Sequence, residues 1–211
     1  CCSRANQEGP VEYGFRGDAL NLDLNRDFMK CDALETEVFE TYFHKLKPHI
    51  FIDTHVSDGA DYQYTMTLVP SQHNRLQNGL MEHFQQNVLL PSLYNSMKNE
   101  GMEMSPYVEF DKEVPDSVIT GFFDGPRFSS GYTSLFNCFS FMAETHMLKP
   151  FDKRVKATYT LLLKLIMLAS KRKNEILTTL RQAEYIATSQ NKIALQWSPD
   201  TAHLYLNYFK G

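Results

Sequence analysis

The chain has 211 residues, 43% of them hydrophobic and 22% charged, so it is long and apolar enough to fold around a sizeable core. A formal net charge of -4 is too even to indicate binding to the phosphates of a nucleic acid, and we expect no nucleic-acid partner. No run approaches the roughly 20 apolar residues that cross a bilayer, because the strongest candidate, residues 161–169, contains Lys164. We therefore expect no membrane span.

The first thirty residues are rich in Gly, Asn, Asp and Arg, and they predict a loop that leads into a short strand near residues 20–24. A helix is expected to follow. Asp32 and Glu35 have the spacing of a capping box, and apolar residues then recur at helical spacing until Pro48.

Two short strands are predicted to end at polar side chains. The apolar run 50–52 is typical of a buried strand, and it runs into His55. A second strand, residues 137–143, ends at Glu144. Between them we expect a helix over residues 72–99 and a loop-like stretch over residues 101–134, and a loop of that length is either functional or contains elements that its sequence does not indicate. A helix that leads into a buried strand indicates an α/β fold, in which ligands bind at strand ends.

The last third of the chain predicts one long helix over residues 151–187 and then a change of pattern. After residue 191 bulky and polar side chains alternate as in a strand. We therefore place a boundary near residue 190, with one domain over 1–190 and the start of a C-terminal β region over 191–211.

Three segments together resemble one family. Residues 21–28 read Asn-Leu-Asp-Leu-Asn-Arg-Asp-Phe, preceded by a glycine-rich loop that contains Arg4, and residues 53–65 and 144–150 contain His55 and Glu144. Over roughly residues 4–170 the chain resembles the zinc metallocarboxypeptidases related to carboxypeptidase A, and most closely a bacterial branch of them. The resemblance implies a partial carboxypeptidase-like three-layer α/β/α fold with a mixed, mostly parallel sheet, and a secreted or periplasmic location.

The resemblance also implies a clamp for a substrate carboxylate. Arg26 would hold the carboxylate through its planar guanidinium, and Asn25 would add an amide donor. Without the surrounding motif, an arginine between Asp23 and Asp27 is more often part of a surface ion pair.

His55 would be a ligand of Zn²⁺, and Glu144 would be the general base that takes a proton from the attacking water. Asp53 or a backbone carbonyl could orient the other ring nitrogen of His55. Without the family context, a histidine at a strand end is more often a satisfied structural residue, and such a glutamate is as often merely paired.

Three further positions match the family pattern less closely. Arg4 matches the arginine that stabilises the oxyanion, although Arg16 in the same loop could take that place. Tyr132 is the candidate for the family's mobile substrate tyrosine, although its spacing in the sequence fits a different position of the family pattern better. Arg127 could favour an acidic group in the substrate or form an ion pair within its loop.

One departure from the family concerns the metal. None of the histidines has a glutamate three residues later, so the His-x-x-Glu pair that supplies the first two zinc ligands is absent, and we expect it before Cys1. The predicted function is zinc-dependent hydrolysis of an amide bond near the free carboxylate of a peptide or amino-acid derivative. Because one histidine cannot fix a metal ion, we expect the 211-residue chain by itself to bind zinc weakly and to be inactive. Two alternatives are a deacylase of N-acyl amino acids, of the desuccinylase or aspartoacylase type, and a binding protein that has lost the metal.

Overall fold

The computed structural model describes residues 15–57, 63–72, 76, 79–110, 119–192, 202 and 210. Its centre is a four-stranded sheet with the strand order β1-β6-β2-β3. Strand β6 is parallel to β1 and antiparallel to β2, and β2 is parallel to β3, so the sheet is mixed and mostly parallel, as predicted. These strands are β1 (Ile50–Ser57), β2 (Met66–Pro70), β3 (Ser105–Pro106) and β6 (Phe139–His146). A separate antiparallel pair comprises β4 (Val108–Phe110) and β5 (Ile119–Gly121).

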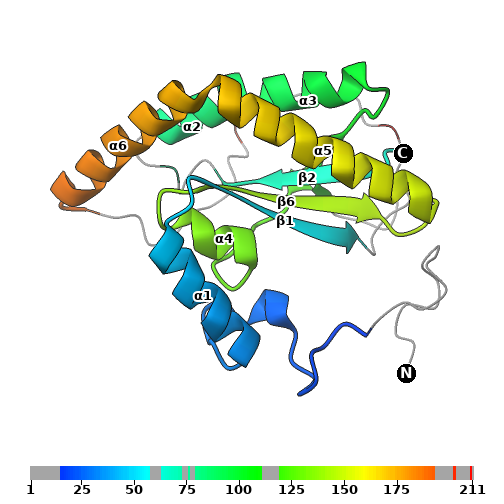
Figure 1. Cartoon of the computed structure of the whole chain (residues 1–211), viewed down its shortest axis with the longest axis horizontal. Coiled ribbons are helices and arrows are strands. Elements are labelled where there is room, and N and C mark those ends of the chain that lie inside the picture. Colours follow the sequence, from blue (N-terminus) through cyan, green and yellow to red (C-terminus); the bar gives the residue numbers. More distant parts are fainter. Residues whose placement is uncertain are drawn as a thin grey trace.

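Helices cover both faces of the sheet (Figure 1). One face is covered by α2 (Leu80–Phe84), α3 (Leu90–Asn99), α5 (Phe151–Lys171) and α6 (Lys173–Ser189). On the other face lie α1 (Leu34–Leu46) and α4 (Ser129–Ser134). The fold is therefore a three-layer α/β/α arrangement, as the resemblance to the carboxypeptidases implies. None of the helices in the described part of the chain is long and apolar enough to cross a bilayer.

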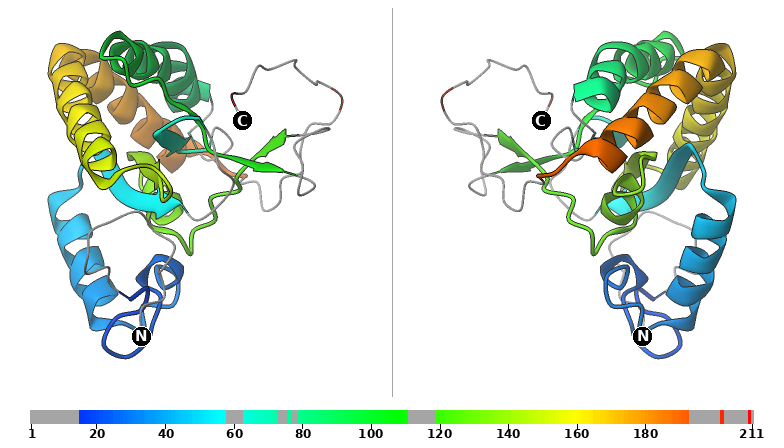
Figure 2. Two further views of the ribbon diagram at one scale, coloured as in Figure 1. Left: turned by 90° about the vertical axis from the view of Figure 1, so that its right-hand side faces the viewer. Right: turned by 90° about the vertical axis from the view of Figure 1, so that its left-hand side faces the viewer.

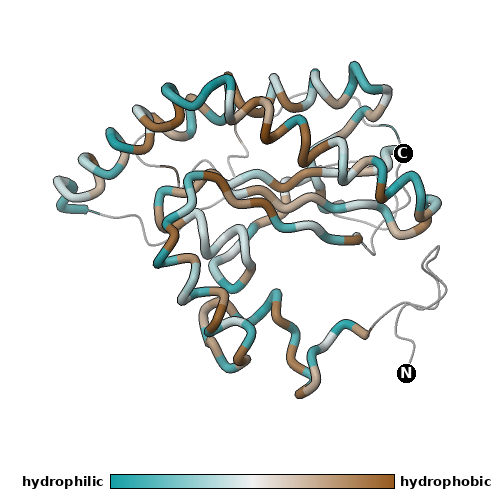
Figure 3. The backbone as a smooth tube through the Cα atoms, viewed as in Figure 1, coloured by the Kyte–Doolittle hydropathy of each residue, from teal (hydrophilic) through white to brown (hydrophobic). Residues whose placement is uncertain are grey.

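Strand β6 holds the centre of the core. Phe139 and Phe141 on this strand are completely buried, and Leu68 on β2 and Leu161 on α5 are buried beside them. The hydropathy colouring shows apolar residues running along the strands and recurring on α5 (Figure 3). Burial of this cluster between the sheet and α3 and α5 is the main apolar contribution to the stability of the described fold.

The segment before α1 differs from the prediction. Residues 20–24 do not form a strand; instead a 3-10 helix, Leu24–Arg26, follows a turn in which the Asp18 carboxylate accepts the backbone N–H groups of Leu20 and Leu22. Side-chain acceptors of this kind compete with strand pairing for backbone donors. The predicted capping box is also wrong, since α1 has no side-chain cap from Asp32.

Other element boundaries also need correction. The helix expected over 72–99 begins at Leu80 and contains a π-helical turn, Gln85–Leu89, before α3. Pro91 follows this turn, and because proline has no N–H it cannot bond the carbonyl four residues earlier. The long loop expected over 101–134 contains β3, β4, β5 and α4, and the single helix over 151–187 is two helices that meet at Arg172. Most of the C-terminal β region predicted for 191–211 lies outside the described residues.

Candidate active site

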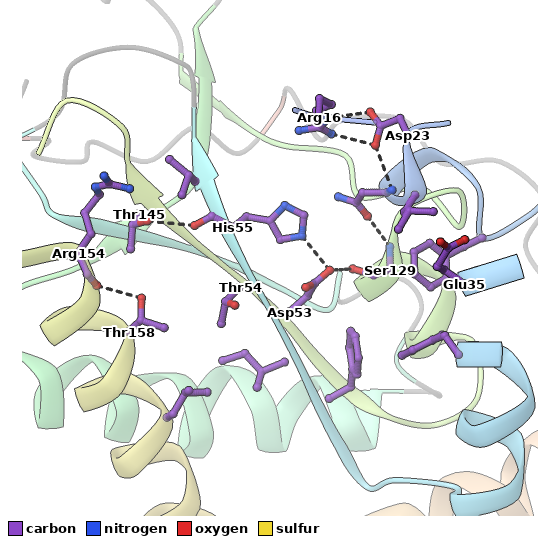
Figure 4. A pocket seen from close by; sticks show the side chains of 18 of the residues that line it. Arg16, Asp23, Glu35, Asp53, Thr54, His55, Ser129, Thr145, Arg154 and Thr158 are labelled. Carbon is purple, nitrogen blue, oxygen red and sulfur yellow. Dashed lines mark hydrogen bonds and ion pairs between the residues drawn. The ribbon is translucent and has the colours of Figure 1, made fainter. Parts of the chain in front are cut away.

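A cavity of about 870 Å³ runs along the outer edge of β1. Strand β1, the loop before α1, and helices α1, α4 and α5 all contribute to its walls. Figure 4 shows its polar end, where His55, Asp53 and Ser129 lie next to Arg16 and Asp23. The cavity therefore brings together side chains that are far apart in the sequence.

His55 is held by a carboxylate. Its Nε2 lies 2.8 Å from Oδ2 of Asp53, and the same oxygen accepts a 2.5 Å hydrogen bond from the Ser129 hydroxyl (Figure 4). Asp53 and His55 are two residues apart on β1, so they point to the same face of the sheet. A histidine whose Nε2 is bonded to a carboxylate presents its Nδ1 to a ligand. The sequence leaves open whether Asp53 or a backbone carbonyl orients the His55 ring, and in the structure it is the Asp53 carboxylate.

Asp53 and His55 also shift each other's pKa. Burial lowers the pKa of His55, but the hydrogen bond and charge of Asp53, with the charge of Glu144, outweigh it and leave this pKa above its ordinary value. Burial raises the pKa of Asp53, but the hydrogen bonds from His55, from the Ser129 hydroxyl and from the backbone N–H of Thr54 leave it below its ordinary value. Asp53 is therefore a carboxylate at neutral pH.

Glu144 is the register partner of His55. The two residues face each other across the parallel β1-β6 pair, each near the end of its strand. Glu144 is half-buried, and its charge acts on the His55 ring. The structure thus places the predicted base beside the predicted metal ligand, although Glu144 is not among the residues that line the cavity.

The predicted clamp residues lie on the other side of Ser129. Oδ1 of Asn25 accepts the backbone N–H of Ser129 at 2.9 Å, so Asn25 lines the cavity and is tied to the first residue of α4. The Arg26 guanidinium lies 4.4 Å from the centre of the Phe128 ring, and that of Arg127 lies 4.9 Å from the same centre. Both arginines are exposed and Phe128 is buried, so one ring supports two cationic groups near the cavity.

Two arginines among the described residues line the cavity itself, Arg16 and Arg154. Arg16 makes a two-pronged ion pair with Asp23, with distances of 2.8 Å and 3.2 Å, and its charge reaches His55. Arg154 is buried and donates to the carbonyl of Lys149. Arg4, the first choice for the oxyanion role, lies outside the described residues.

Tyr132 lies away from the cavity. It is buried in an aromatic cluster with Phe43 and Phe28, and its hydroxyl is 2.9 Å from Nε2 of His44. Burial, together with the charge of Glu40, raises its pKa to about 12. In this position the side chain packs α4 against α1, and its role as a substrate residue stays a prediction.

The ligands for zinc are incomplete in the described part of the chain. His55 and its carboxylate partner fit a zinc-binding histidine, because such a histidine commonly bonds an outer carboxylate. Within the described ranges, however, no three His, Cys, Asp or Glu side chains gather as a metal site. A zinc ion held by His55 would thus need ligands from other residues.

Ser129 is the site residue that the sequence did not indicate. It lies in the region predicted as a loop, and it links Asn25 to Asp53 through its backbone N–H and its hydroxyl. Both contacts join residues 76 or more positions apart, which local patterns cannot show. A serine at the first position of an unpredicted six-residue helix carries no local signal for such a role.

Comparisons with known proteins agree with this architecture. No family model matches the sequence, and no curated protein matches it. Among solved structures, the crystal structure of a metallo-carboxypeptidase from Burkholderia cenocepacia is similar, with a TM-score of 0.53 and 19% identity. The fold resembles a carboxypeptidase. The match covers 74% of this chain and 40% of the Burkholderia chain, so this chain spans well under half the length of that carboxypeptidase.

Proposed function

We propose that the protein is a zinc-dependent hydrolase of the metallocarboxypeptidase type that cleaves an amide bond near a free carboxylate. The observation that carries the proposal is the placement of His55 beside Asp53 and opposite Glu144, in a region that the Asn25-Ser129 contact joins to Arg26. Support for the reaction class also comes from the carboxypeptidase-like fold.

In the proposed reaction His55, Asp53 and Glu144 would each have one role. His55 would hold zinc through Nδ1 while Asp53 fixes the ring. A bound zinc ion supplies Lewis acidity, which polarises a carbonyl and lowers the pKa of water. Glu144 would take a proton from the attacking water and pass it to the leaving amine.

The arginines would recognise negative charge. Arg26 would bind the substrate carboxylate, with Asn25 holding the adjoining loop against α4. Arg16, which lines the cavity near His55, is the described candidate for stabilising the oxyanion. Arg127, whose guanidinium lies against the Phe128 ring as that of Arg26 does, would favour an acidic side chain in the substrate.

Replacement of Glu144 by Gln tests the assigned base. Gln keeps the size of the side chain but cannot accept a proton, so we expect kcat to fall about 10²- to 10⁴-fold with the zinc content unchanged. Glu184→Gln on the exposed surface of α6 is the control, and it should leave kcat unchanged. The assay is hydrolysis of a panel of peptides and N-acyl amino acids by the zinc-loaded polypeptide of the complete reading frame, because the described residues do not complete a metal site. Unchanged turnover in Glu144→Gln would exclude the base, and activity on the acyl amino acids alone would favour a deacylase.

The incomplete ligand set among the described residues keeps one further candidate open, a binding protein without a metal. Such a protein would keep the carboxylate clamp and hold no zinc. Metal analysis of the purified protein decides between the two. One zinc per chain supports the hydrolase, whereas metal-free protein that still binds a peptide carboxylate supports the alternative.

A further inference from the structure

Helix α4 is buried, yet most of its side chains carry hydroxyl groups. All six of its residues are buried, and four of them are serine or threonine. A buried hydroxyl without a hydrogen-bond partner is costly, so a helix that only filled space would carry apolar side chains. The partners of these hydroxyls therefore indicate what the helix does.

Thr133 joins the start of α4 to the central strand. Its Oγ1 donates to the carbonyl of Ser129, one turn earlier in the helix, at 2.9 Å. The same oxygen lies 2.8 Å from Oγ of Ser140 on β6. Because the bond to Ser129 already satisfies the Thr133 donor, the contact with Ser140 is not needed for that purpose. It holds α4 in one place on β6.

Ser140 is itself fixed from the other helix layer. Its N–H donates to Oγ of Ser71 at 2.7 Å, and its carbonyl accepts the N–H of Ser71 at 2.7 Å. The carbonyl of Ser71 accepts Nε2 of Gln85 at 2.7 Å. Gln85 lies in the π-helical turn after α2, in the layer of α3, α5 and α6, and Figure 2 shows this layer and α1 on opposite sides of the sheet. Ser140 is therefore held by bonds that cross the sheet.

These bonds lead to His55. The Ser129 hydroxyl donates to Oδ2 of Asp53, which is bonded to Nε2 of His55 (Figure 4). The backbone N–H of Thr54 also bonds the Asp53 carboxylate, but Thr54 and His55 both lie on β1. Ser129 thus ties this carboxylate to a second element. We call the residues that lead to Asp53 the buried network; each is at most 1% exposed, and they are Gln85, Ser71, Ser140, Thr133 and Ser129.

We propose that Thr133 and Ser140 are positioning residues, which act through Ser129 and Asp53 to fix the His55 ring with its Nδ1 presented to a metal ion. The inference rests on the proposed function, in which that ion is zinc. Neither Thr133 nor Ser140 lines the cavity, so neither would touch the substrate. A carboxylate behind a metal-binding histidine sets the orientation of the ring and the affinity for the metal. A fully bonded buried network makes such an orientation rigid.

Two neighbouring hydroxyls of α4 give a matched test. Thr133→Val removes the hydroxyl that reaches Ser140. Ser134→Ala removes a hydroxyl that bonds the carbonyl of Gly131, within α4, in the contact that the structure shows for it. Both residues are at most 2% exposed, so each variant loses one buried hydrogen bond.

Two further variants make the test independent of a single substitution. Thr133→Ser keeps the hydroxyl and is the conservative variant, whereas Ser140→Ala breaks the same contact from β6. In Thr133→Val the Ser140 hydroxyl keeps an acceptor, the carbonyl of Cys138 at 3.3 Å. In Ser140→Ala the Thr133 hydroxyl keeps the carbonyl of Ser129. We therefore expect all of these variants to fold.

The variants are made in the polypeptide of the complete reading frame, because the described residues do not complete a metal site. One measurement is the dissociation constant for Zn²⁺, and another is the melting temperature. The third is the NMR signal of the His55 Nε2–H proton in the metal-free protein. A hydrogen bond to a carboxylate slows the exchange of this proton with solvent, so its signal reports on the contact with Asp53.

We expect Thr133→Val and Ser140→Ala to weaken zinc binding about 10-fold and to remove the His55 proton signal, because Asp53 is then less firmly held. Thr133→Ser and Ser134→Ala should bind zinc as the unsubstituted protein does and keep the signal. The melting temperature should fall by a few degrees in both Thr133→Val and Ser134→Ala, since each loses a buried hydrogen bond. Stability thus changes in both variants, whereas His55 responds in only one of them.

Two results would overturn the inference. One is an unchanged zinc affinity and an unchanged His55 signal in Thr133→Val and Ser140→Ala. The other is an equal effect of Ser134→Ala on His55, which would mean that any loss of packing in α4 disturbs the site. The proton signal is recorded without metal, so it decides the role of Thr133 even if the polypeptide holds no zinc. In that case metal analysis refutes the hydrolase alone, and the two failures stay distinguishable.

Discussion

At the residue scale, Asp27 shows how a motif residue can be structural. Its carboxylate accepts the backbone N–H groups of Asp32 and Ala33 at 3.0 Å and 2.9 Å, although it lies outside the helix that these residues precede. It is 5% exposed, and it fixes the two residues that come directly before α1, a helix whose N-cap residue, Ala33, makes no side-chain cap bond. The Asp that follows Arg26 in the motif therefore anchors the start of α1.

Replacement of Asp27 by Asn should destabilise the protein in a pH-dependent way. Burial tends to raise the pKa of Asp27, but the N–H groups of Ala33 and Asp32, with Thr36 and Lys30, leave it below its ordinary value of 3.8. A lowered folded pKa gives stability that is fully present above the unfolded pKa and is lost as the pH falls through the folded one. We expect Asp27→Asn to reduce the free energy of unfolding by about 0.5–2 kcal/mol at pH 7, with the difference shrinking below about pH 4.

Urea unfolding at pH 7 and at pH 3 measures this difference. Asp32→Asn is the control, because the Asp32 side chain is exposed and pairs only with Lys30 in the contacts that the structure shows for it. A loss for Asp27→Asn that is as large at pH 3 as at pH 7 would mean that the charge of Asp27 contributes nothing.

The candidate site was predictable where a residue follows a recognisable strand. His55 and Glu144 each come near the end of an apolar run, and parallel pairing of those runs makes them neighbours. Arg16 and Ser129 depend on how loops fold over the sheet, and their contacts with Asp23 and Asp53 have no counterpart in a local pattern. His55 and Glu144 could therefore be predicted from the sequence, whereas the places of Arg16 and Ser129 could not.

At the element scale, α4 packs too closely on the preceding loop to accept a side chain at Gly131. A Cβ there would lie 2.1 Å from the Gly125 carbonyl oxygen and 2.7 Å from that of Asp124. The same helix starts at Ser129, which holds Asp53. Close packing of α4 is thus a condition for the geometry around His55.

Gly131→Ala should therefore destabilise the protein, even though alanine favours helices. The gain in helix propensity is about 1 kcal/mol, but the contact is with backbone atoms that cannot rotate away. We expect a net loss of about 1–3 kcal/mol in the free energy of unfolding, measured by urea denaturation. Gly125→Ala is the matched control, because a Cβ at Gly125 meets nothing within 4 Å. Equal stability of the two variants would contradict the close packing.

The same scale shows why helix α4 was missed while β1 was found. Strand β1 carries a dense apolar signal, whereas α4 reads Ser-Ser-Gly-Tyr-Thr-Ser, a run of small polar residues with no helical period. All six residues of α4 are buried, and hydroxyl contacts such as that of Thr133 with Ser140 satisfy their polar atoms. The helix is specified by its surroundings rather than by its own propensity, which local reasoning cannot see.

At the scale of the whole molecule, α5 has two apolar sides, one buried in the core and one exposed. One side, with Ala157, Leu161 and Leu165, packs into the core against the sheet and α3. The other side, with Val155 and Tyr159, lines the cavity along β1. The periodicity of the sequence predicted this long amphipathic segment, but it could not separate the side that is buried within the chain from the side that is left exposed.

Truncation of one residue on each side should reveal this division in the 211-residue chain. Leu161 is fully buried, so Leu161→Ala removes packed methyl groups and should lower the free energy of unfolding by about 2–5 kcal/mol. Val155 is 50% exposed, and Val155→Ala should change it by no more than about 0.5 kcal/mol. Both values come from urea unfolding of the same chain under one set of conditions. A loss for Val155→Ala as large as that for Leu161→Ala would mean that Val155 is packed as tightly as Leu161, and that α5 does not have one buried and one exposed apolar side.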